Sequence, residues 1–186
     1  MAKVTVEPSE FHFVLFDAAE IEKIVGEVAD LVGIAPDASI VVKIDESTPL
    51  GRTQIASLEP ITLTVEGGAF ENAKAPRQLS DRSVRDVTSR LLFRVLDRTS
   101  GRFDNAPAEG DVPLPHNVAW DAHAVGRSAR LGVPVSKARR LYHFRNRHGF
   151  NDTADAAFET LWSADSMTWD ELDAIVNDVA AARTPA

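Results

Sequence analysis

The strongest signal in the sequence is one long helix near its middle, over residues 79–101. Apolar residues recur there at steps of three and four, which places them along one side of an α-helix. Ser80 is a suitable N-cap, and Gly101 can adopt the left-handed conformation that ends a helix. Phe93 and Asp97 lie nearly opposite the apolar stripe, so we expect packed layers on two sides of this helix. The stripe consists of Val84, Val87, Thr88, Leu91, Leu92, Val95 and Leu96.

The elements before this helix predict an α+β fold. Asp17 and Glu20 form a variant of the capping box, and the apolar periodicity that follows predicts a helix ending at Gly33. Alternating or β-branched runs predict strands over 39–45 and 60–66, with shorter ones over 3–7 and 54–58, and a polar connection carries Pro76 into the long helix. We therefore expect a small mixed sheet packed on two helices.

The second half of the chain is predicted to be helical. Residues 102–111 have no periodicity and form a loop or linker, the best candidate for a boundary. Helices are predicted over 115–131, 136–148 and 152–163, and Thr168 with Glu171 forms a capping box for a last one. The expected organisation is an α/β half over 1–101 and a helical C-terminal layer over 112–183, packed together as one compact unit.

Composition excludes several classes of chemistry. The chain of 186 residues contains no cysteine, which rules out disulfides, thiolate zinc sites and a cysteine nucleophile. There is no run of some eighteen apolar residues and no basic segment leading into an apolar one, so we expect a soluble cytoplasmic protein without a membrane partner.

The net charge of −8 is unevenly distributed along the chain. Residues 1–50 and 151–186 are both acidic, whereas residues 51–150 hold sixteen of the twenty Lys and Arg against ten carboxylates. The acidic and basic parts can face each other within the fold, or the middle segment can bind an anionic partner.

The order of elements in the first hundred residues resembles that of the small zincin-like metallopeptidases. The resemblance rests on FDAAEIEKIVGEVADLVGI, SIVVKID, TPLGR and PITLTVEGG, followed by the long helix. In that family the helix carries His-Glu-x-x-His, which binds zinc. The matching residues here are 93–97: Phe93 cannot bind a metal, Arg94 cannot act as a base, and Asp97 alone makes no zinc site. The resemblance thus implies a zincin-like fold that lacks its catalytic metal.

The predicted helix over 136–148 is basic, with Tyr142 and Phe144 between its cations. Such a composition can pair with phosphates or carboxylates while the rings stack. The alternative is internal: the aromatics are the buried side, and the arginines pair with the acidic last helices or with Asp81, Asp86 and Asp97. The candidate residues for binding an anion or a partner are Lys137, Arg139, Arg140, Arg145 and Arg147.

Each residue of the turn after the basic helix has a predicted structural role. We expect Gly149 to be left-handed, Phe150 to contact Phe144, and Asp152 to cap the next helix.

A second set of residues could assemble a nitrogen and oxygen site for zinc or another divalent metal. The spacing is unfavourable, because positions 116 and 123 lie about 10.5 Å apart along a helix axis. The candidates are His116, Asp121, His123, His143 and His148.

These observations lead us to expect a non-catalytic binding protein that needs no cofactor and whose partner is an acidic protein surface or an anionic small molecule. The alternative hypothesis is a metal-dependent hydrolase that uses the histidines of the helical half. A second alternative is nucleic-acid or anion binding through the basic helix, although the overall acidity would oppose a polyanion.

Overall fold

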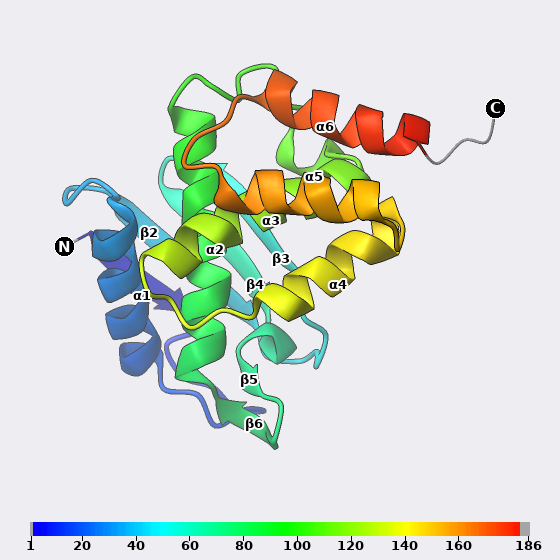
Figure 1. Cartoon of the computed structure of the whole chain (residues 1–186). Coiled ribbons are helices and arrows are strands. Elements are labelled where there is room, and N and C mark those ends of the chain that lie inside the picture. The colour runs from blue at the N-terminus through cyan, green and yellow to red at the C-terminus, as the bar shows by residue number, and fades with distance from the viewer. Residues whose placement is uncertain (1, 183–186) are drawn as a thin grey trace. The chain divides into compact units, whose positions relative to one another are not determined.

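The computed structural model describes residues 2–182 and has the predicted α+β fold, a mixed four-stranded sheet followed by a helical C-terminal part (Figure 1). The chain forms two compact units, Met1–Val95 and Leu96–Ala186. The division therefore falls inside helix α2 (Asp81–Thr99) and not in the 102–111 segment. In the described part of the chain, no helix has the length and apolar character needed to cross a membrane.

The sheet of the first unit has the strand order β1-β2-β4-β3, in which β1, β2 and β4 are parallel and β3 is antiparallel to β4. The strands are β1 (Lys3–Glu7), β2 (Ser39–Asp45), β3 (Thr53–Leu58) and β4 (Ile61–Glu66). Because side chains alternate along a strand, the register stacks Val6, Val42 and Leu63 on one face, while Lys43, Thr62 and Thr64 lie on the other. Only the first face is buried, which fits a sheet covered by helices on one side.

Two helices accompany this sheet, as the sequence predicts. Helix α1 (Ala18–Val32) begins where Asp17 Oδ1 accepts hydrogen bonds from the N–H groups of Ala19 (2.8 Å) and Glu20 (3.3 Å). It ends at Gly33, which has a φ of 91°. Both ends were predicted correctly.

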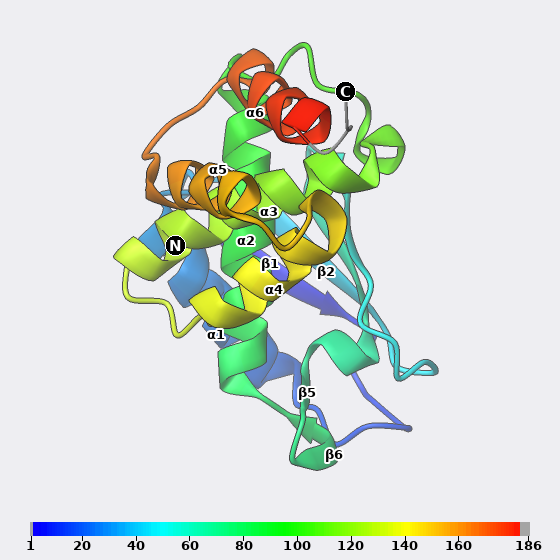
Figure 2. The same ribbon diagram turned by 45° about the vertical axis from the view of Figure 1, so that its right-hand side comes forward.

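Helix α2 is tied to the rest of the first unit by arginines in its first half and at its middle. Arg85 donates to Glu27 of α1 (2.7 Å), and Arg90 Nη2 donates to Thr53 Oγ1 of β3 (2.7 Å). The predicted N-cap is confirmed, since Ser80 Oγ accepts a bond from the N–H of Ser83 (3.2 Å). Figure 2 shows α2 with α1 and the strands of this unit from a second direction.

The connection into α2 has more structure than the sequence indicates. After a short 3-10 helix, Gly67–Ala69, the chain forms a hairpin of β5 (Glu71–Asn72) and β6 (Ala75–Leu79), so Pro76 lies in a strand and not in an irregular loop. Arg77 has a φ of 66°, and its carbonyl accepts a bond from Leu15 N–H (2.7 Å). The 10–17 segment is thereby attached to the hairpin.

The second unit consists of four described helices around an aromatic core. They are α3 (Leu114–Arg130), α4 (Lys137–His148), α5 (Asp152–Ser163) and α6 (Trp169–Ala182). Phe103 stacks on Trp120 with ring centroids 4.5 Å apart, and Trp120 lies 5.9 Å from Trp169. The 102–111 segment is therefore packed, because Phe103 within it is buried and Arg98 binds Glu109 (2.8 Å).

Helices α3 and α5 approach unusually closely at Gly126. A Cβ atom built on Gly126 would lie 2.2 Å from the carbonyl oxygen of Trp162. No other residue type fits there without a backbone shift.

The ends of the last two helices test the sequence analysis directly. The capping box of α6 is confirmed: Thr168 N–H donates to Glu171 Oε2 (2.8 Å), and Glu171 N–H donates to Thr168 Oγ1 (3.3 Å). At α5, however, the cap is Asn151 and not Asp152, since Asn151 Oδ1 accepts from Ala154 N–H (2.9 Å). Asp152 is instead the first residue of the helix.

Candidate functional site

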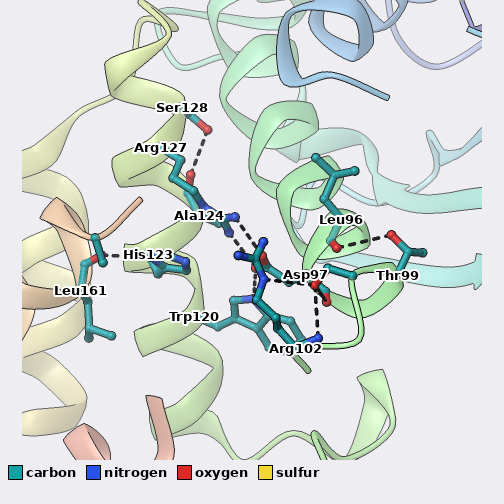
Figure 3. Close-up of polar contacts among 12 residues, drawn as sticks. Leu96, Asp97, Thr99, Arg102, Trp120, His123, Ala124, Arg127, Ser128 and Leu161 are labelled. Atoms are coloured by element: carbon teal, nitrogen blue, oxygen red, sulfur yellow. Dashed lines mark hydrogen bonds and ion pairs between the residues drawn. The ribbon is translucent and has the colours of Figure 1, made fainter. Parts of the chain in front are cut away.

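Asp97, the last residue of the 93–97 stretch singled out in the sequence, is a buried carboxylate with hydrogen-bond donors on both oxygens. Asp97 is 1% exposed, and both of its oxygens are bonded within the second unit. Arg127 donates from Nη1 to Oδ1 (2.8 Å) and from Nη2 to Oδ2 (2.6 Å), and Trp120 Nε1 donates to Oδ2 (2.7 Å). Figure 3 shows both donors reaching Asp97 from α3. Both oxygens of Asp97 thus take part in contacts that hold the last turn of α2 to α3.

The residues beside Asp97 along α2 are also buried. Phe93 and Arg94 have almost no exposed surface, and Arg98 stacks over the ring of Trp120 at 4.9 Å from its centroid. Arg98 donates in addition to the carbonyl of Pro107 (2.9 Å). The 93–97 stretch thus supplies packing and ion pairing within the described structure.

His123 lies on α3 between Trp120 and Arg127, but its imidazole bonds to Leu161 of α5 and not to Asp97. Its Nδ1 is 3.2 Å from the carbonyl oxygen of Leu161, which can only accept, so Nδ1 carries the proton (Figure 3). Burial, together with repulsion from Arg127, lowers the pKa of His123 to about 4. The imidazole is therefore neutral at pH 7, and its buried Nε2 has no hydrogen-bond partner among the described residues.

The other candidate metal ligands have separate partners. His116 Nε2 donates to Asp173 Oδ1 (2.8 Å), and His148 Nε2 donates to the carbonyl of Pro115 (3.0 Å). Asp121 faces Arg140 at 3.7 Å, and His143 is exposed on α4. Within residues 2–182, the structure forms no group of three or more His, Asp or Glu side chains that could hold a metal ion.

Three of the five basic candidates on α4 are paired with carboxylates of the same unit. Lys137 Nζ binds Glu159 (2.7 Å), Arg145 Nε binds Asp155 (2.7 Å), and Arg140 faces Asp121 as described. The alternative in which arginines pair with the last helices is thus correct for Arg145, whose partner lies on α5. Lys137 also pairs with α5, and Arg140 faces α3. Arg139 and Arg147 are exposed.

The aromatics of α4 divide between the interior and the surface. Phe144 is buried and stacks on His148 at 4.0 Å, as expected for the inner side of the helix. Tyr142 is 57% exposed and Phe150 is 64% exposed. Their rings meet edge to face at 6.2 Å, so Phe150 contacts Tyr142 and not, as predicted, Phe144. Gly149 does have a positive φ, 108°.

These exposed side chains define one surface, which we call the α4 face. Successive helical turns place them on the outer side of α4, with Phe150 just beyond its end. The α4 face consists of Arg139, Tyr142, His143, Asn146, Arg147 and Phe150.

The electrostatics of the α4 face are positive although the chain as a whole is acidic. Burial, and then repulsion from Arg140 and Arg139, lower the pKa of His143. The carboxylate of Asp121 acts in the opposite direction and raises this pKa. The face therefore combines two guanidinium groups with exposed aromatic surface, a composition that is enriched at protein interfaces.

The sequence analysis found the basic helix but not the shape of this surface. It named five basic residues, of which Lys137, Arg140 and Arg145 lie beside carboxylates of the same unit. It assigned Phe150 to the interior, because helix-end patterns favour an apolar contact back to the helix. The exposed pair of Tyr142 and Phe150 depends on the path of the chain after Gly149, which no local pattern fixes.

Comparison with known proteins gives no further identification: no protein-family model, curated protein or solved structure matches the chain.

Proposed function

We propose that this protein is a non-catalytic binding protein whose α4 face recognises an acidic surface on another protein. The observation that carries the proposal is the exposed contact between Tyr142 and Phe150, bordered by Arg139 and Arg147. Exposed aromatic surface next to arginine is characteristic of binding sites, whereas single exposed apolar residues are common and carry no such meaning.

The proposal includes a zincin-like fold without its metal. The lack of a metal is supported by Asp97, whose two oxygens accept three hydrogen bonds from Arg127 and Trp120. A metal ligand needs an available lone pair directed at a shared point, and the paired partners of His116 and His148 direct these rings elsewhere.

An acidic protein surface is favoured over nucleic acid by the balance of charge. The α4 face offers two exposed arginines, and the chain around it has a net charge of −8. Affinity for a polyanion grows with the number of phosphates neutralised, so two cations on an acidic protein make a poor nucleic-acid site.

The test is an NMR titration of the intact protein with a glutamate-rich peptide at low salt. We expect saturable shifts of the α4 amides that weaken with added salt, and their loss in the Arg139→Glu/Arg147→Glu variant. Lys23→Glu, an exposed charge reversal on α1, is the matched control and should bind as the wild type does.

Two results would overturn the proposal. Stoichiometric zinc or manganese in protein purified without chelator would support the metal-dependent hydrolase instead. Saturable binding of a short RNA or DNA duplex at physiological salt, with no response to the peptide, would support the nucleic-acid alternative.

A further inference from the structure

Three residues of α3 close the C-terminal end of α5, and we call this contact the α3–α5 joint. The carbonyl groups in the last turn of a helix have no partner within that helix. Here His123 Nδ1 donates to the carbonyl of Leu161 (3.2 Å; Figure 3), and Arg130 Nη1 donates to the carbonyl of Trp162 (2.6 Å). Between them, Gly126 lets the backbone of α3 approach Trp162 closely. Because positions 123, 126 and 130 are three and four residues apart, they share one side of α3.

The connection from α5 to α6 depends on the same joint. Arg130 Nη2 donates to the carbonyl of Ala164 (2.7 Å), and Arg130 Nε lies 3.1 Å from Asp165 Oδ1. Both of these residues precede α6, whose Leu172 and Val176 belong to the buried core of this unit. Opening of the α3–α5 joint would therefore loosen the second unit from the end of α5 onwards.

His123 is the member of the joint that can change its charge near neutral pH. Glycine does not titrate and arginine stays protonated, whereas an ordinary imidazole has a pKa of 6.5. His123 is 0% exposed, and its Nδ1 already holds a proton that it donates to Leu161. A second proton must therefore bind to Nε2, which is buried and makes no hydrogen bond within the described part of the chain.

The surroundings of His123 oppose this second proton. Burial is the largest cause, and Arg127 and Arg130 of α3 repel the added charge. Asp97 in the last turn of α2 and the Leu161 carbonyl of α5 act in the opposite direction. The balance lowers the pKa of His123 to about 4, so the ring in the closed joint is neutral at pH 5.

Protonation of His123 requires the joint to open. A charged imidazole that is buried without an acceptor is costly, so the protonated ring must move until its Nε2–H reaches water. Because the same ring donates to Leu161, this movement breaks the bond that holds the end of α5. The charged residues that act on His123 all belong to the second unit, which begins at Leu96. We infer that the α3–α5 joint is an acid-sensitive switch: uptake of a proton by His123 separates the end of α5 from α3, while the first unit stays folded.

Hydrogen–deuterium exchange of the intact protein at pH 7.5 and pH 5 tests this inference. After correction for intrinsic exchange, the protection of amides 161–164 should fall by about thirtyfold, since the open ring binds a proton with its ordinary pKa of 6.5 and the closed ring does not. The amides of β2 in the first unit are the internal reference, and their protection should change by less than about twofold.

Two variants assign the effect to His123. In His123→Gln the amide can still donate to Leu161 but does not titrate, so the protection of amides 161–164 should change by less than about threefold over the same pH range. The matched control is His143→Gln, which removes an exposed histidine of α4 and should keep the change of about thirtyfold.

The wild type alone also decides the matter, whether or not His123→Gln folds. Its imidazole nitrogen resonances should show a neutral ring with the proton on Nδ1 at pH 5. A ring that is protonated at pH 5 while amides 161–164 stay protected would overturn the inference. So would an equal loss of protection in both units, which indicates global unfolding, or a protection that does not depend on pH.

Discussion

The interiors of the two units contain different types of side chain. The first unit packs aliphatic and largely β-branched side chains, with Ile40, Val42 and Leu63 typical of its buried sheet face. The second packs aromatic rings and contains a buried ion pair, and Trp120 Nε1 donates a hydrogen bond to Asp97. An aliphatic interior spreads its stabilisation over many small contacts. An aromatic and ionic one concentrates it in a few residues, so single substitutions should cost more there.

The chain provides a convenient way to observe the two interiors separately. All three tryptophans, Trp120, Trp162 and Trp169, lie in the second unit. Intrinsic tryptophan fluorescence therefore reports on that unit, while amide NMR signals of the strands report on the first. The predictions for Asp97 and Ile40 use this difference.

The largest effect is expected from Asp97→Asn, which leaves the Arg127 guanidinium buried beside a neutral amide. Breaking a buried ion pair from one side typically costs about 3–5 kcal/mol, so we expect a loss of that size in denaturant unfolding followed by tryptophan fluorescence. The matched control is Asp81→Asn on the same helix, whose exposed pair with Arg85 should cost less than about 1 kcal/mol.

Replacing both partners gives the complementary measurement. The Asp97→Leu/Arg127→Met variant should recover part of the stability lost by Asp97→Asn, because neither charge of the pair remains, while the buried Trp120 N–H loses its acceptor. Equal stability of Asp97→Asn and the wild type would contradict the claim that this pair concentrates the stability of the second unit.

The next largest effect is a dependence on pH through His123. Its pKa is about 4 in the folded protein and 6.5 in its ordinary state, so the unfolded chain binds more protons between these values. The free energy of unfolding must then fall as the pH falls from 6.5 towards 4, by up to about 1.4 kcal/mol per pH unit and about 3 kcal/mol in total.

The variant His123→Gln isolates this contribution, because the amide can donate to Leu161 and does not titrate. We expect its stability, measured by denaturant unfolding from pH 7.5 to 4, to decrease less than that of the wild type over this range. Parallel curves for the two proteins would show that His123 is not the group responsible.

A smaller effect is expected from Gly126→Ala at the contact of α3 with α5. In an unobstructed helix this change stabilises a protein by up to about 1 kcal/mol. Here the new Cβ would meet the backbone of Trp162, so we expect a loss of about 1–3 kcal/mol in thermal or denaturant unfolding. A gain in stability would mean that the helices separate there at little cost.

The smallest effect is expected in the aliphatic interior. Ile40→Val in β2 removes one buried methylene and should cost about 0.5–1.5 kcal/mol, measured from the strand amide signals. A cost comparable to that of Asp97→Asn would remove the distinction between the two interiors.

Whether a contact is local or long-range in the chain explains how far the sequence could predict the structure. Local patterns are sufficient for helix ends such as Asp17 with Gly33 and Thr168 with Glu171, because the interacting groups are neighbours in the chain. Alternation is sufficient for β2 and β4. The hairpin of β5 and β6 was missed, because its two strands are short and polar and carry Pro76, which argues against a strand.

The candidate site was less predictable for a related reason. Asp97 and Arg127 are thirty positions apart, and nothing in either segment indicates that they meet. The sequence shows that Asp97 cannot make a zinc site alone, but not what it does instead. On α4, charge pattern alone could not separate Arg139, which is exposed, from Arg145, which is held by Asp155.

The division of the chain inside α2 limits how the protein can be shortened. A fragment beginning at Ser100 would retain the aromatic rings of the second unit, but it would lose Asp97 and with it the counter-charge of Arg127. A helical fragment that keeps this ion pair must therefore include the last turn of α2, which belongs to the second unit from Leu96 onwards.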